Sequence, residues 1–510
     1  MLNKKTLKMS MIFLVLITSS AFASGGQKKS TSSPAPPPPP RPAAPARPAP
    51  QAQPRSNPSV NRNNTGGVNR TPTGGVTPGS RPGTGVGVSN RPAIGNTGGY
   101  RPPTPGTHTV MTRSGGQMEM GANNKPTHFV GKDGQEAKFG SKGQITQIHD
   151  PKHNMTIEHG ARPGERRVVT EQNGRRLVST GAHSGYMERP YLNRNGHTYY
   201  QRTYWRDGHA YARAYRGYYY GGVRYYGYAP AFYYHPAFYG WAYSPWGAPV
   251  YYGWGWGAAP WFYGGYFAPA PFYGSASLWL TDYLLAEDLK QDYDAKQEAQ
   301  ARAQTENQGS PENGDQNTTA APLSPQVKQM IDAEVQQQLA QENAAAQSQG
   351  NGPAPVGNEA PPPALDPKQR LFVVADSLSV ATADGQECGL TAGDVLTRID
   401  DSPNGDNKVR VSVMSSKPND CTMGMMPLVA VNDLQEMHNS FQAQLDTGLQ
   451  TLAQKSGTGG LPKAPDAQTV PGEVPPPSPD GNVDAKLAEQ QNQATQTEAE
   501  VRQEVPPANQ

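Results

Sequence analysis

The stretch HTYYQRTYWRDGHAYARAYR, residues 197–216, decides the fold expected for the first half of this chain. Two runs of alternating side chains flank Asp207 and Gly208, and Asp-Gly favours a two-residue type I′ turn because both positions tolerate positive φ. The stretch is therefore predicted to be a β-hairpin. Along one face this turn pairs Arg206 with His209, Tyr204 with Tyr211, Arg202 with Arg213 and Tyr200 with Tyr215; along the other it pairs Trp205 with Ala210, Thr203 with Ala212 and Gln201 with Ala214.

One face of this hairpin alternates arginine with tyrosine and is a candidate contact surface for a polyanion or a glycan. Arg202 opposite Arg213 places like charges side by side, which costs stability unless an anion lies across the pair. Tyrosine rings can stack on a ligand, and guanidinium groups bind acidic groups. The alternative is an ordinary half-exposed hairpin, and a slip of one residue in register would remove the arrangement. The candidate contact residues are Tyr200, Arg202, Tyr204, Arg206, Tyr211, Arg213 and Tyr215.

Residues 108–228 repeat the signature of short alternating runs separated by two-residue turns. Asp-Gly, Lys-Gly and Asn-Gly pairs recur between the runs, and such pairs favour tight hairpins. We therefore predict a meander of β-hairpins. The segment 143–150, GQITQIHD, resembles a repeat unit of the YD/Rhs-type β proteins.

Residues 229–276 form a repeat that is rich in tyrosine and tryptophan and has no charged side chain. Proline and glycine every few residues exclude a long helix and disfavour a central strand. We interpret the repeat as an adhesive segment that stacks on itself, on sugars or against the following helix. The alternative is a loop that wraps its own domain. The next segment, 277–304, is predicted to be a helix with Ser277 as its cap, and its apolar first half is expected to pack on the repeat.

Polar segments separate and follow the predicted domains. Residues 305–323 and 346–365 are linkers in composition. Between them, 324–345 places apolar residues on one stripe and is predicted to be an amphipathic helix that docks or pairs. Residues 456–510 are rich in proline, glutamine and acidic residues and are predicted to be a disordered acidic tail, with a short helix near 484–503.

Residues 366–455 have the pattern of a conventional small β domain with a terminal helix. Apolar runs predict five strands, and an amphipathic stretch predicts a helix over 433–455. Cys388 and Cys421 are the two cysteines of the chain. In an exported protein an even pair is expected to form a disulfide.

The segment 388–400, CGLTAGDVLTRID, resembles the strand-turn of PDZ domains. Leu371 to Val374 stand where those domains have their carboxylate-binding loop, so the resemblance does not extend to the peptide site. The same turn resembles that of bacterial SH3-like barrels, and both topologies stay open. The whole layout resembles exported bacterial proteins that share the helix start DLQEMHN, residues 433–439, a resemblance that implies no activity.

The N-terminus has the pattern of a secretory signal peptide over residues 1–23. Three lysines precede a short apolar run, and Ala21-Phe22-Ala23 is a cleavage pattern. A retained anchor is the alternative. Residues 24–107 follow as a linker rich in proline and glycine, which we predict to be disordered. We therefore expect an exported protein of the periplasm, the cell envelope or the extracellular space, with no transmembrane span in the mature chain.

Composition excludes a single large core. The chain has 510 residues, among them 56 glycines and 51 prolines, and it has too little apolar area to offset the ordering of its whole length. The fold class expected is mainly β with long disordered segments. The net charge of +3 conceals a basic half and an acidic half, because residues 1–280 carry 31 basic and 9 acidic side chains and residues 281–510 carry 14 and 33.

Motifs for phosphate binding, serine hydrolysis and zinc proteolysis do not occur in the sequence. We expect no enzyme activity, no cofactor and no metal. His149 and His153 are separated by Pro151, so they cannot share a helical face. The leading hypothesis is a non-enzymatic adhesive or interaction protein of the envelope or matrix. Its expected partners are acidic envelope polymers, glycans or a second copy of the chain, and not cytosolic nucleic acid.

Two alternatives from other classes stay open. A glycan-active enzyme would draw its catalytic carboxylates from the meander, and a retaining pair would need its carboxyl groups about 5 Å apart. A PDZ-like adaptor would instead bind peptides through residues 366–455. The carboxylates available to the enzyme are Asp150, Glu158, Glu165 and Glu171.

Overall fold

The structure is a computed structural model that describes residues 107–160, 162–181, 184–206, 208–305, 321–348 and 360–505. The predicted signal peptide and nearly all of the predicted proline-rich linker lie outside these residues. The mainly β class is confirmed, because the elements comprise a 12-stranded antiparallel sheet, a six-stranded sheet and two pairs of short strands, with a few long helices.

The large sheet is a meander in which each strand pairs with the next along the chain. Positive φ angles at Asn195 and Gly196, 51° and 78°, are those of a type I′ turn. Asparagine and glycine adopt such angles at little cost, which is why this signal predicts hairpins. The strands are β1 (His108–Met111), β2 (Gln117–Met120), β3 (Pro126–Val130), β4 (Glu136–Phe139), β5 (Ile145–Asp150), β6 (Met155–His159), β7 (Arg166–Gln172), β8 (Arg175–Gly181), β9 (Ser184–Arg194), β10 (His197–Arg206), β11 (His209–Tyr220) and β12 (Val223–Ala229).

The hairpin of β10 and β11 has the register predicted from the sequence. Tyr204 faces Tyr211, Arg202 faces Arg213, and the alternate positions pair threonine, glutamine and tryptophan with alanine. Arginine and tyrosine therefore lie on one face of the sheet, and Gln201, Thr203 and Trp205 lie on the other with their alanine partners.

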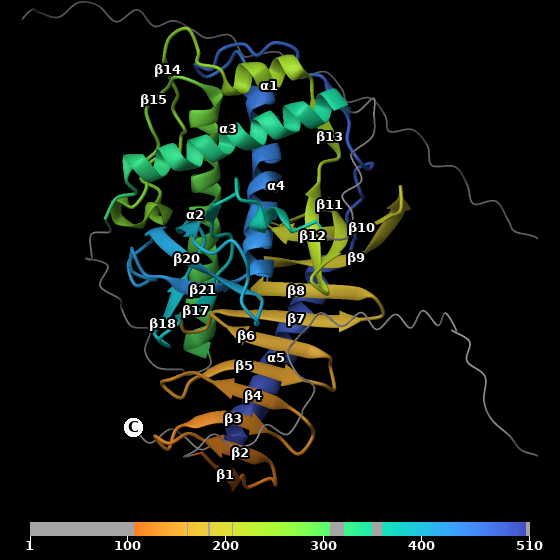
Figure 1. The fold of residues 1–510 in the computed structure, drawn as a ribbon, viewed down its shortest axis with the longest axis vertical. Helices are drawn as coiled ribbons and strands as arrows, with labels where there is room; N and C mark the ends of the chain where they lie inside the picture. Colours follow the sequence, from red (N-terminus) through yellow and green to blue (C-terminus); the bar gives the residue numbers. More distant parts are fainter. Residues whose placement is uncertain are drawn as a thin grey trace, which may run out of the picture. The chain divides into compact units, whose positions relative to one another are not determined.

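A helix covers the other face of the sheet. Figure 1 shows α5 (Val483–Glu504) running across the strands, and its buried Ala494 and Val501 pack on Phe129, Ile157 and other apolar side chains of β2 to β7. One helical turn advances about 5.4 Å, close to the strand spacing of about 4.8 Å, so successive turns meet successive strands. The disordered tail expected over 456–510 is thus corrected for 456–505, where α5 matches the short helix predicted near 484–503 and supplies a second layer on the sheet.

The aromatic repeat contributes several of its rings to a core. Phe238, Tyr239, Tyr266 and Tyr273 are fully buried, and they join Trp279 of the following helix in one apolar cluster. The prediction that the repeat stacks on itself and on that helix is borne out by these contacts, and seven of its nineteen aromatic rings are buried, nine are half-buried and three are exposed. The elements are β13 (Phe232–Tyr234), α1 (Pro236–Tyr243), β14 (Val250–Tyr251), η1 (Pro260–Gly265), β15 (Phe272–Tyr273), α2 (Ala276–Thr305) and α3 (Pro325–Ser348).

The C-terminal β domain is a six-stranded sheet with the order β16-β19-β20-β21-β17-β18, followed by α4 (Val431–Lys455). Cys388 and Cys421 form the expected disulfide. Helix α4 packs beside α2, and α3 lies across both (Figure 1). The remaining elements are η2 (Pro363–Leu365), β16 (Leu371–Val373), β17 (Leu378–Thr382), β18 (Glu387–Leu390), β19 (Val395–Arg398), β20 (Lys408–Ser415), β21 (Pro427–Ala430) and β22 (Thr469–Pro471), which pairs with β13.

Among the helices in the described ranges, none combines the length and the apolar character needed to cross a membrane.

Candidate functional site

A cleft of about 1880 Å³ lies on the arginine and tyrosine face of the large sheet, between that face, helices α2 and α4, and the C-terminal β domain. Its floor is formed by β6 to β12, because alternate residues of these strands point to the same side. The tyrosines that line it are Tyr186, Tyr204, Tyr211, Tyr215, Tyr219, Tyr225, Tyr226, Tyr228 and Tyr283.

Five of the seven predicted contact residues line this cleft, namely Tyr204, Arg206, Tyr211, Arg213 and Tyr215. The rings of Tyr204 and Tyr211 stack with their centroids 5.2 Å apart, and the hydroxyls of Tyr204 and Tyr215 are 2.7 Å apart.

Tyr200 lies outside the cleft lining and packs edge-on against Tyr226, with their ring centroids 5.1 Å apart.

Arg202 is not available to an external ligand, which corrects its assignment to the contact surface. Its side chain is 1% exposed. The guanidinium donates to Glu188 at 2.6 Å and to both carboxylate oxygens of Glu436 on α4 at 2.6 and 2.9 Å. Burial alone would lower the pKa of Arg202, but Glu436 and its neighbours hold it above its ordinary value. The anion that the Arg202–Arg213 pair requires is thus the protein's own glutamate.

The other two arginines of the predicted surface contact α2 and α4, the helices that line the cleft. Arg213 donates to the hydroxyl of Thr447 at 2.8 Å and lies 5.2 Å from the ring centroid of Tyr211. Arg206 donates to the side chain of Gln291 at 3.2 Å. The Arg213 guanidinium therefore keeps donors that can face a ligand, whereas Arg206 also donates to the backbone carbonyl of Glu287 at 3.4 Å and pairs with the Glu287 carboxylate at 3.8 Å.

The charge of the cleft lining is mixed and does not favour a polyanion. Nine lysines and arginines line the cleft against twelve aspartates and glutamates, a formal balance of 9 − 12 = −3. The basic charge of residues 1–280 is therefore compensated here by carboxylates of the acidic half, including Glu436, Asp433 and Asp446.

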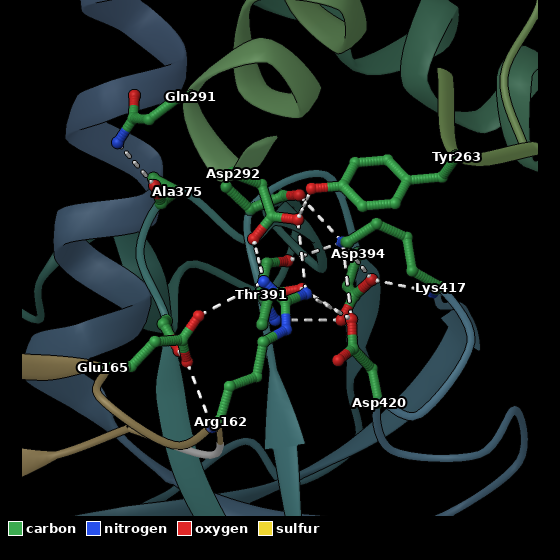
Figure 2. A network of polar contacts seen from close by, with 12 residues as sticks. Arg162, Glu165, Tyr263, Gln291, Asp292, Ala375, Thr391, Asp394, Lys417 and Asp420 are labelled. Atoms are coloured by element: carbon green, nitrogen blue, oxygen red, sulfur yellow. Dashed lines mark hydrogen bonds and ion pairs between the residues drawn. The ribbon is translucent and has the colours of Figure 1, made fainter. Parts of the chain in front are cut away.

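A buried polar network adjoins the cleft, whose lining includes Glu165 and Asp292 of this network (Figure 2). Arg162, in the loop between β6 and β7, donates to Glu165 at 3.2 Å and forms a bidentate pair with Asp292 of α2 at 2.9 and 3.2 Å. The same side chain reaches the hydroxyl of Thr391 in the C-terminal β domain at 2.9 Å. One arginine therefore joins three segments that are distant in sequence.

The pKa values of the two carboxylates on Arg162 move in opposite directions. Burial raises the pKa of Glu165 above its ordinary value in spite of the arginine. Burial acts the same way on Asp292, but Lys417 and Arg162 hold the pKa of Asp292 below its ordinary value. Because the guanidinium bridges the two carboxylates, their negative charges are compensated by Arg162 within the protein.

A second cluster continues this network within the C-terminal β domain. The ammonium of Lys417 lies 2.7 Å from Asp394 and 3.6 Å from Asp420, and the three side chains are 1% exposed or less. Figure 2 shows Tyr263 of the aromatic repeat extending over this group from the opposite side. Burial raises the pKa of Asp394 to about 7.

Of the four carboxylates of the enzyme alternative, Glu158, Glu165 and Glu171 line the cleft, and each has an arginine partner. Asp150 accepts from Thr497 of α5 and lies on the face away from the cleft. Glu158 pairs with Arg167, and Glu171 pairs with Arg176 on the next strand.

In the part of the chain that the structure describes, no group of three or more His, Cys, Asp or Glu residues has the arrangement of a metal site. His153 instead contacts Asp150 at 2.6 Å, and His149 contacts Thr156 at 3.3 Å.

Sequence reasoning missed Glu436, Asp292 and Lys417. Each acts through a partner more than 20 residues away, and no local pattern reports such a contact. The one available signal was Asp394 in the Gly-Asp turn, whose side chain accepts from the backbone N–H groups of Thr391 and Lys417.

Comparisons of the chain with protein-family models, with curated proteins and with solved structures find no match.

Proposed function

We propose that this chain is an exported, non-catalytic binding protein that holds a glycan in the tyrosine-lined cleft. The observation that carries the proposal is the cleft itself, in which the stacked rings of Tyr204 and Tyr211 and the guanidinium of Arg213 converge between the large sheet and α4. The signal pattern at the N-terminus, the disulfide and the result for membrane-spanning helices support an exported chain.

The size and chemistry of the cleft favour an extended, hydroxyl-rich ligand. Pockets for single small molecules measure roughly 300–1,000 Å³, and this cleft is larger at about 1880 Å³. Aromatic faces suit the apolar faces of sugar rings, and paired charges offer both donors and acceptors for hydroxyl groups. A lining without surplus positive charge supports a neutral or weakly charged glycan better than an acidic polymer.

The test measures binding of the full chain to soluble neutral and acidic polysaccharides by calorimetry. Tyr211→Ala removes one partner of the stacked pair in the cleft, and an aromatic contact contributes about 0.5–1.5 kcal/mol, so we expect affinity to fall up to about tenfold. Tyr251→Ala is the matched control, because Tyr251 is 63% exposed on β14 and does not line the cleft.

Three results would contradict the proposal. They are the absence of binding to every polysaccharide, an equal loss of affinity in the two variants, and a preference for acidic polymers that salt abolishes. Shortening of the polysaccharide during the experiment would instead support the glycan-active enzyme.

A further inference from the structure

Lys417 and Asp394 have an arrangement that goes beyond ligand binding. The Lys417 Nζ donates to Asp394 Oδ1 at 2.7 Å and to the backbone carbonyl of Ala392 at 2.8 Å. Asp420 places a second carboxylate 3.6 Å from the same nitrogen. All of these side chains are shielded from water, and the rings of Tyr263 and Tyr266 lie 5.9 and 5.8 Å from the nitrogen.

We propose that Lys417 and Asp394 condense to form an intramolecular isopeptide bond, with Asp420 as the proton carrier. The Nζ–Cγ bond forms, one Cγ–O bond of Asp394 breaks, and the ammonium and the carboxylate together become an amide and one molecule of water. Asp420 accepts a proton from the nitrogen and returns it to the departing oxygen. No oxidant, cofactor or second protein takes part.

The reaction can begin only when the Lys417 nitrogen has lost a proton. Burial by itself lowers the pKa of Lys417, but Asp394 and the neighbouring carboxylates hold it above its ordinary value, so the ammonium is the resting form. The nitrogen becomes nucleophilic when it passes a proton within the cluster. Burial favours this exchange, because it raises the pKa of Asp394 to about 7 and penalises two separated charges.

Asp420 has the free acceptor that a proton carrier requires. Its Oδ2 accepts from the hydroxyl of Thr391 at 2.5 Å. Its Oδ1 is buried and has no hydrogen-bond partner among the residues that the structure describes. A buried acceptor without a donor is costly in a merely structural pair, and here it lies on the carboxylate next to the Lys417 ammonium.

The backbone around Asp394 fits both the transition state and the product. The N–H of Thr391 donates to Asp394 Oδ2 at 3.0 Å, and the N–H of Lys417 donates to Oδ1 at 3.1 Å. Donors in this position stabilise the negative oxygen of a tetrahedral intermediate. In the amide product the remaining oxygen keeps one of these donors, and the amide N–H can donate to the carbonyl of Ala392.

The experiment uses the full mature chain, reduced, alkylated and digested with trypsin. Asp394 and Cys388 lie in the fragment 371–398, and Lys417 and Cys421 lie in the fragment 411–455, because Pro418 blocks cleavage after Lys417. Once the disulfide is reduced, only an isopeptide bond can join these fragments. We expect a joined species in the mass spectrum that is lighter than the two fragments by one molecule of water. Separate fragments in the wild-type digest would overturn the proposal.

Variants separate the roles of the side chains. We expect the uncondensed mass, without loss of water, for the variants Lys417→Met and Asp394→Ala. Asp420→Asn should leave most of the chain uncondensed, because a side-chain amide at position 420 cannot carry the proton. Lys328→Met is the matched control, because Lys328 forms a 2.8 Å pair with Asp282 that is 24% exposed on the lysine side. The Lys328→Met variant should still be lighter than the uncondensed chain by one molecule of water. Full condensation in Asp420→Asn would overturn the role of Asp420 whether or not other variants fold.

Discussion

Arg202 on β10 and Glu436 on α4 are joined by two parallel hydrogen bonds of 2.6 and 2.9 Å, although 234 residues separate them in the sequence. The rings of Tyr186, Tyr215 and Tyr226 surround the guanidinium at 4.1 to 5.0 Å from its carbon. This contact ties the large sheet to the C-terminal β domain.

Replacement of this arginine should therefore destabilise the whole chain. Arg202→Met leaves the buried Glu188 without its partner, and breaking one side of a buried pair costs about 3–5 kcal/mol. Urea unfolding followed by tyrosine and tryptophan fluorescence measures the change. Arg410→Met is the matched control, because Arg410 pairs with Asp400 on an exposed surface, and we expect its unfolding midpoint to stay at the wild-type value. Equal changes in the urea unfolding midpoint of the two variants would show that Arg202 contributes no more to stability than a surface residue.

Stability should decrease as pH rises from about 4 to about 7. Burial raises the pKa of Asp288 to about 7 and the pKa values of Asp433 and Asp446 to about 6. A folded state that holds protons more tightly than the unfolded chain is most stable below the unfolded pKa and loses that advantage as pH passes the folded pKa. His438, whose pKa burial lowers to about 4, offsets part of this loss over the same pH range. Glu498, whose pKa is lowered to about 2, also acts in the opposite direction but in stronger acid.

Thermal unfolding between about pH 4 and about pH 8 checks this dependence. Asp288→Asn removes the charge and keeps an acceptor for Gln444, which donates to Asp288 at 2.6 Å. We expect this variant to have a flatter profile than the wild type and to gain stability near pH 7, on the order of a few kcal/mol. A wild-type profile that rises steadily with pH would contradict the prediction.

Helix α5 should be needed to keep the large sheet soluble. Val501 is fully buried against the apolar side of the sheet, and Val501→Asp would place an unpaired charge there. We expect detachment of the helix, binding of a hydrophobic dye and aggregation. Ala499→Asp, at an exposed position on the same helix, should behave like the wild type. Unchanged dye binding in Val501→Asp would show that the sheet does not depend on α5.

The parts predicted well from the sequence are those specified by neighbouring residues. The register of the β10–β11 hairpin follows from a two-residue turn, and the disulfide follows from the two cysteines. The helix near 484–503 was predicted, but its burial against the sheet and the ordering of the segment before it could not be, because the buried face of α5 carries polar Gln490, Gln491 and Thr497. These polar side chains can be buried because they form hydrogen bonds with polar groups of the sheet, such as Thr170 and Ser179.

The contact between Arg166 and Gln491 spans 325 residues of sequence, and this span has a consequence for biosynthesis. Strands β1 to β8 leave the ribosome well before α5, the helix that covers them. Contacts so distant in sequence form slowly, because the intervening chain must first be closed into a loop. The sheet therefore cannot complete its core until α5 has been synthesised and released from the ribosome.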